Sequence, residues 1–349
     1  MVIITTKMPV FNKIAGFRML VGAVMVATIL GGALSSCRKA PQWRLKEGAV
    51  WNTTYRITYC APADLGDSIQ GVFRQVENSL SPFAGGSLIS QINRGATDSV
   101  DSLITRVFDI SVRVNGLSQG RFDPTVSPVV NLWKFGYTGK VDADSLFEPS
   151  QAQIDSALQL VGIADCSIRG GRLVKKAAGT TFNFSAVTKG YACDLILEML
   201  RRNGATDAMV EIGGEVAVAG QSPRGDSWRL QVDAPEFSED SVIHKPLEII
   251  EVADCGVATS GNYRNFHHDA SGRRVGHTID PRSGRPATSE FLSVTVVAPT
   301  CAEADAYATA LMATPDRAQA DEILKAVPEL KVLLVTEDTI LKHNWFGAR

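Results

Sequence analysis

The chain has 349 residues, 45% of them hydrophobic, and a nearly balanced charge of −2 at pH 7. At the usual size of about 100–200 residues per domain, this length allows one large domain or two ordinary ones. The balanced charge gives no argument for the basic surface that nucleic-acid-binding proteins use, so we expect no nucleic-acid partner.

The first 36 residues are typical of a lipoprotein signal peptide. A basic start is followed by an apolar run over 19–34, which is shorter than the roughly 20 residues that a spanning helix needs. The run ends in Leu-Ser-Ser-Cys at 34–37, which resembles the bacterial lipobox, so Cys37 is the predicted lipidation site. An uncleaved membrane anchor is the alternative. Both interpretations tether the rest of the chain to a membrane, outside the cytoplasm, and a linker is expected over 37–46.

The remaining cysteines are spread singly along the chain, without a CxxC pair or metal-ligand spacing. An exported compartment would permit disulfides. Their odd number, and the helix or strand settings of Cys193 and Cys301, favour buried free thiols instead. These cysteines stand at positions 60, 166, 193, 255 and 301.

In chain order, the first half is predicted to contain one strand followed by helices and a loop. The alternation of polar and apolar residues predicts a strand over 51–59. Apolar residues at helical spacing predict helices over 64–80 and 101–118. A polar, acidic surface loop is expected over 139–149, followed by a short helix over 154–161.

The second half is expected to be rich in strands joined by tight turns. A long helix is predicted over 186–203, with Gly204 as its stop signal, and the chain closes with helices over 301–312 and 316–326 and a strand over 332–336. Because consecutive strands are linked by turns, the sheet should be largely antiparallel and the class α+β. The other predicted strands are 167–175, 180–184, 207–212, 215–219, 228–232, 247–252 and 292–298.

Two oxygen-bearing side chains, Asp305 and Thr309, stand four residues apart on the predicted helix over 301–312. This spacing puts both on one face, among alanines, as a recessed site for a hard cation such as magnesium. Thr300 and Glu303 form a capping box that sets the start of the helix. Each residue also has a structural explanation, because Asp305 favours the helix dipole and Thr309 can bond back to the backbone.

A second segment, over 183–194, begins the long helix. Lys189 in its early turns is unfavourable for the helix dipole unless a negative ligand neutralises it, which indicates phosphate binding. An exposed lysine whose stem covers apolar surface is the alternative. The glycine pair at 213–214 suits a tight hairpin turn, or the close approach of a flat ligand.

Two further segments carry polar residues with possible roles in catalysis or binding. His277 lies in a dense polar motif over 276–286 and is the leading acid/base candidate. Adjacent His267 and His268 would face opposite ways on a strand and are expected at the surface. Phe122 and Asp123 form either a turn or the frame of a ring and its polar edge. Potential phosphate-binding arginines are Arg264, Arg282 and Arg285.

Together these segments resemble the ApbE family of FAD:protein FMN transferases. The resemblance implies an α+β, ApbE-like (T-fold-like) domain over 47–349, and an exported enzyme. It would transfer FMN from FAD to a threonine hydroxyl through a phosphoester bond and release AMP. The matching motifs, in family order, stand at 122–126 (FDPTV), 131–133 (NLW), 185–186 (SA), 189–191 (KGY), 212–215 (IGGE), 258–261 (ATSG), 277, 279–281 (IDP) and 297–305 (VAPTCAEAD).

Site residues carry over from the resemblance by position. Magnesium would be held by the Ala186 carbonyl, Asp305 and Thr309, and His277 would help to activate the acceptor threonine. Flavin contacts would come from Trp51, Phe83, Arg121, Phe122, Asp123, Asn183, Lys189 and Ile279.

Three positions depart from the usual family pattern. The family often has an acidic residue at Asn183, Met-Gly at Trp51 and Asn52, and Tyr or Trp at Phe83. Asn183 can still hydrogen-bond, and both aromatic rings can still stack. These departures bear on FAD affinity more than on the reaction.

The resemblance also implies partners and a location. The acceptors would be membrane redox complexes with a Ser/Thr-Gly-Ala-Thr-like motif, and the enzyme would be lipid-anchored at the inner membrane, facing the periplasm. Two alternatives remain. Water replacing threonine would make the protein an FAD pyrophosphatase that yields FMN and AMP, and a site without chemistry would make it a flavin-binding lipoprotein.

Overall fold

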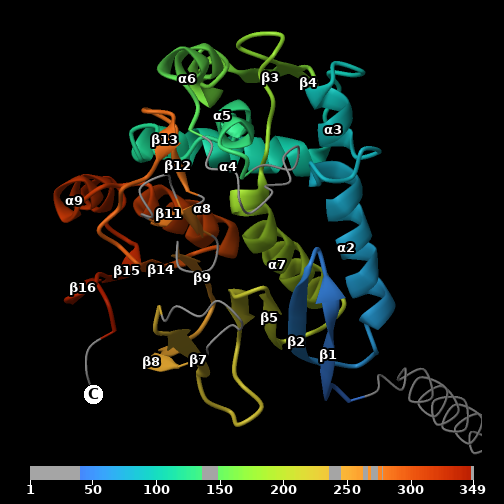
Figure 1. Cartoon of the computed structure of the whole chain (residues 1–349). Coiled ribbons are helices and arrows are strands. Elements are labelled where there is room, and N and C mark those ends of the chain that lie inside the picture. The colour runs from blue at the N-terminus through green and yellow to red at the C-terminus, as the bar shows by residue number, and fades with distance from the viewer. Residues whose placement is uncertain are drawn as a thin grey trace, which may run out of the picture. The chain divides into compact units, whose positions relative to one another are not determined.

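The computed structural model describes residues 40–135, 148–235, 245–261, 266–268, 274–276 and 278–346. The chain divides into two units, 1–40 and 41–349, and the elements below belong to the second (Figure 1). The predicted signal peptide and Cys37 lie outside the described residues. Within the described ranges no helix combines the length and apolar character needed to cross a membrane.

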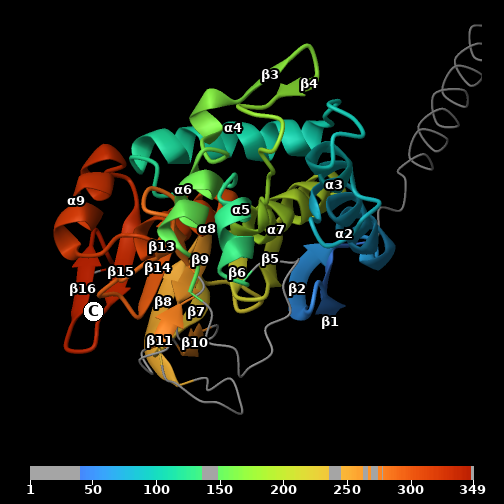
Figure 2. The ribbon, with the colours of Figure 1, turned by 45° about the horizontal axis from the view of Figure 1, so that its top comes forward.

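An eight-stranded sheet forms the centre of this unit, in the order β1-β2-β5-β6-β9-β14-β15-β16. Every strand pairing in the described part is antiparallel, which confirms the predicted α+β class. β1 and β16 are the edge strands and lie at opposite sides of the view in Figure 2. The strands are β1 (Gln42–Val50), β2 (Thr53–Ala61), β5 (Asp207–Ile212), β6 (Glu215–Ala219), β9 (Cys255–Gly261), β14 (Ser293–Ala298), β15 (Lys331–Val335) and β16 (Ile340–His343).

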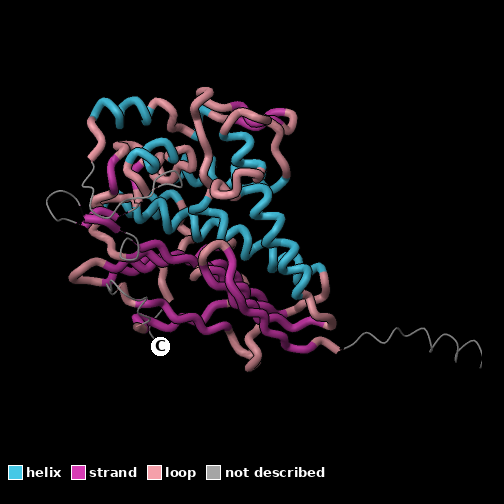
Figure 3. Tube along the Cα trace, turned by 45° about the vertical axis from the view of Figure 1, so that its right-hand side comes forward, coloured by secondary structure: helices cyan, strands magenta, loops and turns pink. Residues whose placement is uncertain are grey.

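Helices cover one face of this sheet (Figure 3). The two that bear on the site are α7 (Ser185–Arg202) and α8 (Cys301–Met312). α8 is buried on nearly every side, which suits its alanine-rich composition. The remaining helices are α2 (Gly66–Leu80), α3 (Leu88–Asn93), α4 (Ser102–Leu117), α5 (Ser127–Leu132), α6 (Gln151–Leu158), α9 (Arg317–Ala326) and the 3₁₀ turn η1 (Ile163–Asp165).

The other face of the sheet is covered in part by a hairpin of β7 (Trp228–Asp233) and β8 (Pro246–Val252). Trp228 packs there with outward-facing residues of the sheet, including Val216 and Val257. The described residues therefore form a large core under the helices, a smaller one under this hairpin and a third around Trp133, Ile154 and Ile279. The other short pairs are β3 (Ser167–Arg169) with β4 (Arg172–Val174), β10 (Phe266–His268) with β11 (Arg274–Gly276), and β12 (Ile279–Asp280) with β13 (Arg285–Pro286).

The tight turn predicted at the glycine pair is confirmed. Ile212 at the end of β5 pairs directly with Glu215 at the start of β6. Gly213 and Gly214 form the two-residue loop between them, with φ of +63° and +102°. Backbone of this kind is open to glycine at little cost, which explains the choice of residues.

Two predicted segments, a linker and a strand, differ from the structure. The linker ends earlier than expected, because β1 begins at Gln42 and pairs with Ala61 of β2. The predicted strand over 180–184 has no strand partner and forms no strand in the structure. Its backbone bonds instead to the Asn93 side chain, which accepts from the Phe182 amide and donates to its carbonyl at 2.8 Å each. An amide side chain mimics a neighbouring strand here, so the alternation of Phe182 and Phe184 does not mark a sheet.

Smaller differences concern the loops and the thiols. The predicted strand over 167–175 is the β3–β4 hairpin, turned by glycines with positive φ. Most of the loop predicted over 139–149 lies outside the described residues. The described cysteines are free thiols, as predicted, but Cys60 and Cys255 are partly exposed and not buried.

Candidate functional site

A partly buried ion pair links the first turns of α7 to the sheet. Lys189 of α7 pairs with Glu215, the first residue of β6, whose side chain is 5% exposed. Glu215 shares a face of β6 with Ala217 and Ala219, which belong to the core under the helices. A carboxylate among small apolar residues is costly to bury unless it has partners. One of its oxygens, Oε2, is buried without a hydrogen-bond partner among the described residues.

Asp305 of α8 lies close to this pair. It is 4% exposed, and its Oδ2 accepts a hydrogen bond from the Gly190 amide at 3.1 Å. Thr309 follows one turn later on the same face of α8, and its Oγ1 is 3.4 Å from Oγ of Ser260 on β9. We call the carboxylates of Glu215 and Asp305 and the hydroxyls of Ser260 and Thr309 the oxygen cluster.

The charges of this cluster favour a cation. Burial raises the pKa of Glu215 to about 7 and raises the pKa of Asp305. Burial alone would lower the pKa of Lys189, but the Glu215 and Asp305 carboxylates more than offset this and raise it. Two carboxylates facing one ammonium leave the cluster short of positive charge, which a bound cation would supply.

The start of α7 brings Ala186 to the same place. In an α-helix the amide of residue 190 points toward the carbonyl of residue 186. Because the Gly190 amide also donates to Asp305, the Ala186 carbonyl and the Asp305 carboxylate converge on one N–H. Asn183 precedes the helix, and its Oδ1 accepts from the Ser185 amide at 2.9 Å. The structure therefore gathers Ala186, Lys189, Asp305 and Thr309.

The described residues contain no group of three or more His, Cys, Asp or Glu side chains arranged to hold a metal. A metal here would need carbonyl and hydroxyl ligands besides a carboxylate. Such an oxygen set suits a hard cation such as Mg²⁺ better than a transition metal.

The stretch predicted to contact flavin at 121–123 is engaged inside the protein. Arg121 donates from Nη1 to Asp280 Oδ2 at 2.9 Å and to the Ala313 carbonyl at 3.0 Å. Phe122 is 3% exposed and belongs to the main core. These contacts fix the loop that carries Arg121 and Phe122. That these two residues contact flavin stays a prediction.

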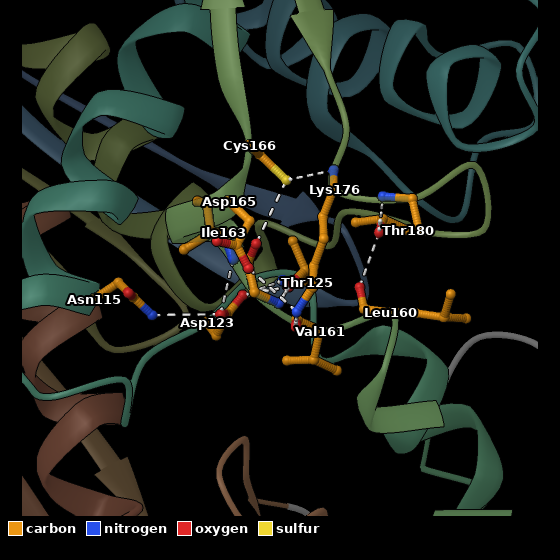
Figure 4. Close-up of polar contacts among 12 residues, drawn as sticks. Asn115, Asp123, Thr125, Leu160, Val161, Ile163, Asp165, Cys166, Lys176 and Thr180 are labelled. Carbon is orange, nitrogen blue, oxygen red and sulfur yellow. Dashed lines mark hydrogen bonds and ion pairs between the residues drawn. The ribbon is translucent and has the colours of Figure 1, made fainter. Parts of the chain in front are cut away.

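Asp123 is the centre of a buried network (Figure 4). Its Oδ1 accepts from the amide and hydroxyl of Thr125 at 2.8 and 2.5 Å, and its Oδ2 accepts from the Ile163 amide at 3.0 Å. Burial raises its pKa, although these donors oppose the rise. The carboxylate thus joins the loop after α4 to η1.

The other residues predicted to contact flavin differ in exposure. Trp51 is partly buried, has a φ of +49°, and meets Phe73 edge-on at 5.5 Å between ring centroids. Phe83 is 71% exposed, so its ring offers a face for stacking. Ile279 is buried beside Trp133, whose indole N–H donates to the Gly284 carbonyl at 2.8 Å.

Other predicted residues are occupied elsewhere or lie outside the described chain. His277 and Arg264 are outside the described residues, as are the side chains of His267 and His268. Arg285 donates to Gln151 at 2.7 Å and pairs with Glu148 at 3.3 Å. It is thereby held at the surface by α6 and not by the oxygen cluster.

Sequence reasoning missed Glu215 as a site residue, although a signal was present. Residues paired directly across a two-residue hairpin point to the same face of the sheet. Because Ile212 is apolar, it is expected to face the core. Glu215, its direct partner, is then expected to face the core as well. A charged residue at such a position is rarely buried without a partner or a function.

The fold and site define an α+β protein with a cation-favouring oxygen cluster at a helix N-terminus. Residues 51–334 match the model of the ApbE family, and the chain belongs to this family. It is 32% identical to the FAD:protein FMN transferase of Vibrio cholerae over 298 residues, covering 83% of this chain and 86% of that protein. It is 30% identical to the Salmonella typhimurium protein of the same name, covering 80% and 83%.

Solved structures show the same fold. The apo flavinyl transferase ApbE of Pseudomonas stutzeri superposes with a TM-score of 0.77 at 28% identity, covering 89% of this chain and 98% of that one. The flavin transferase ApbE of Vibrio cholerae superposes with a TM-score of 0.74 at 30% identity, covering 86% and 96%.

Proposed function

We propose that this protein is a magnesium-dependent FAD:protein FMN transferase. It splits the pyrophosphate of FAD, attaches FMN to a threonine hydroxyl of a target protein through a phosphoester, and releases AMP. The main observation behind this proposal is that Asp305 of α8 lies against the first turns of α7, where Ala186 and Lys189 stand. The named relatives, which are FAD:protein FMN transferases, support it.

The residues present fit a magnesium ion. The Ala186 carbonyl, Asp305 and Thr309 would hold it, and the unpartnered oxygen of Glu215 adds negative charge nearby. Three protein oxygens leave half of an octahedral shell to water and pyrophosphate oxygens. When bound, Mg²⁺ supplies positive charge to the bridging and leaving oxygens of the pyrophosphate.

The chain's own groups would bind and orient the substrate. Besides its pairing with Glu215, the Lys189 ammonium would offer donors to phosphate oxygens, and the positive end of the α7 dipole favours the same anion. The threonine oxygen attacks the phosphorus of the FMN half, the bond from that phosphorus to the bridging oxygen breaks, and AMP leaves with that oxygen. A base must take the threonine proton, and His277 remains the proposed one.

The partners and location belong to the same proposal. Acceptors would carry a Ser/Thr-Gly-Ala-Thr-like motif, as in membrane redox complexes, and the enzyme would be anchored through Cys37 at the inner membrane, facing the periplasm. The lipobox at 34–37 supports the anchor. Labelling with a fatty-acid analogue tests it, because Cys37→Ser should abolish the label.

A mass assay tests the transferase activity. The protein is incubated with FAD, Mg²⁺ and a threonine-bearing acceptor peptide, and a peptide with alanine at that position is the control. We expect an FMN-sized mass gain on the threonine peptide only, together with AMP. Rapid release of free FMN without acceptor would support a pyrophosphatase, and FAD that stays intact for hours would support a flavin-binding protein.

A further inference from the structure

The carboxylate of Asp194, on α7, closes the amino end of α8. One oxygen accepts from the Cys301 amide and the other from the Ala302 amide, at 2.9 Å each. A helix leaves its first amides without intrahelical partners. Asp194 satisfies two of them from a neighbouring helix, and its negative charge also suits the positive end of the helix dipole.

The helix's own cap covers a different amide. Thr300 Oγ1 accepts from the Glu303 amide at 3.3 Å, so only half of the predicted capping box forms. The Glu303 carboxylate accepts from the Thr300 hydroxyl and pairs with Arg113. Thr300 and Asp194 thus have separate tasks: the first caps α8 locally, and the second ties α8 to α7.

Steric contacts hold the same end of α8 from two more sides. A Cβ at Gly190 of α7 would lie 2.3 Å from the Cys301 carbonyl oxygen, and one at Gly256 of β9 would lie 2.1 Å from the Cys301 nitrogen. The backbone of Cys301 is therefore wedged between α7 and the sheet. Van der Waals contact limits its approach, but the directional bonds to Asp194 set its rotation and register.

This register decides the geometry of the proposed metal site, because the proposed ligands belong to two helices. Ala186 lies on α7, whereas Asp305 and Thr309 lie on α8. Each residue of an α-helix turns by about 100° around its axis. A slip of α8 by one residue would therefore turn Asp305 away from the Ala186 carbonyl.

We propose that Asp194 is a positioning residue that locks α8 onto α7 in the register that the magnesium site requires. The inference rests on the proposed function and extends it to a group that touches neither metal nor substrate. Its signature is selective loss of divalent-ion affinity.

Asp194→Asn is the test variant. The asparagine carbonyl can accept from one amide of α8, but its NH₂ group meets the other amide donor to donor. Electron paramagnetic resonance of Mn²⁺, with ADP present as the pyrophosphate probe, reports metal affinity without turnover. We expect the Mn²⁺ dissociation constant to rise by roughly 10-fold or more, as for other groups that orient metal ligands. The Mg²⁺ concentration for half-maximal AMP release should rise in parallel, and excess Mg²⁺ should restore most of the rate.

Two controls separate positioning from loss of a helix cap. Asp101 caps α4 through the Ile104 amide at 2.8 Å, so Asp101→Ala removes a helix-capping bond elsewhere. Thr300→Ala removes the local cap of α8 and keeps the bond to α7. Both should keep Mn²⁺ affinity within about 3-fold of wild type, since neither changes the tie that orients the ligands. If Asp194→Asn does not fold, Asp194→Glu retains the charge but displaces α8, and the same loss of Mn²⁺ affinity is expected.

The outcomes are distinguishable. Wild-type activity with unchanged Mn²⁺ affinity in Asp194→Asn would overturn the inference, as would an equal loss in Thr300→Ala. A wild-type protein that neither binds Mn²⁺ with ADP nor cleaves FAD would overturn the proposed function and this inference with it.

Discussion

Replacing Gly190 with alanine should push α8 away from α7 and disable the site. The added Cβ would lie 2.3, 2.6 and 2.9 Å from the Cys301 oxygen, the Cys301 carbon and the Ala302 nitrogen. All three atoms are backbone and cannot rotate away. Ordinary contact begins near 3.4 Å, so the helices must separate locally by about 1 Å.

Such a shift has two costs. Overpacking of a core costs about 1–3 kcal/mol, and weakening of the Gly190 bond to Asp305 adds about 1 kcal/mol. Alanine in place of a helical glycine returns about 0.5–1 kcal/mol, so we expect a net loss near 2 kcal/mol. A displacement of about 1 Å in catalytic groups lowers the rate by roughly 100-fold.

Urea denaturation measures the free energy of unfolding, and AMP release at saturating FAD and Mg²⁺ measures the rate. Gly116→Ala is the matched control, because Gly116 also lies in a helix and its added Cβ would meet nothing within 4 Å. That variant should keep full activity and gain up to about 1 kcal/mol. If Gly190→Ala proves as stable and active as Gly116→Ala, α7 and α8 are not in tight contact at Cys301.

Three further variants test the carboxylates. Asp305→Asn should lower Mg²⁺-dependent AMP release by roughly 100-fold or more, yet leave the urea midpoint unchanged or higher, because burial raises the pKa of this carboxyl and penalises its charge. Asp123→Asn should cost about 2–3 kcal/mol in urea denaturation, since an NH₂ group replaces one of the two accepting oxygens and leaves the donors of either Thr125 or Ile163 without an acceptor; an unchanged midpoint would contradict the network. For Asp194, burial raises the pKa from 3.8 to about 6, so the folded protein binds this proton more tightly, and the contribution of Asp194 to wild-type stability falls as pH rises from about 4 to 6. Asparagine does not titrate in this pH range. The unfolding free energy of Asp194→Asn minus that of the wild type should therefore rise by about 1 kcal/mol between pH 5 and 7.5. A fall in this difference would refute the raised pKa of Asp194.

Local patterns predicted most secondary structure because its determinants are near in sequence. The start of α8 was placed correctly, since Thr300 and the following alanines define a helix within one turn. The segment 180–184 shows where this fails. Its alternation fits a strand, but the partner is Asn93, which is 89 residues away from Phe182.

The same distinction between local patterns and long-range contacts applies to the site. By itself the sequence determined that Asp305 and Thr309 share a helix face and that Lys189 stands near a helix start, because helical periodicity decides both. Only the tertiary structure decided that Lys189 pairs with Glu215, and that Asp194 holds amides 107 and 108 residues away. Such contacts depend on how closely helices and sheet can approach, and short-range periodicity does not encode that distance.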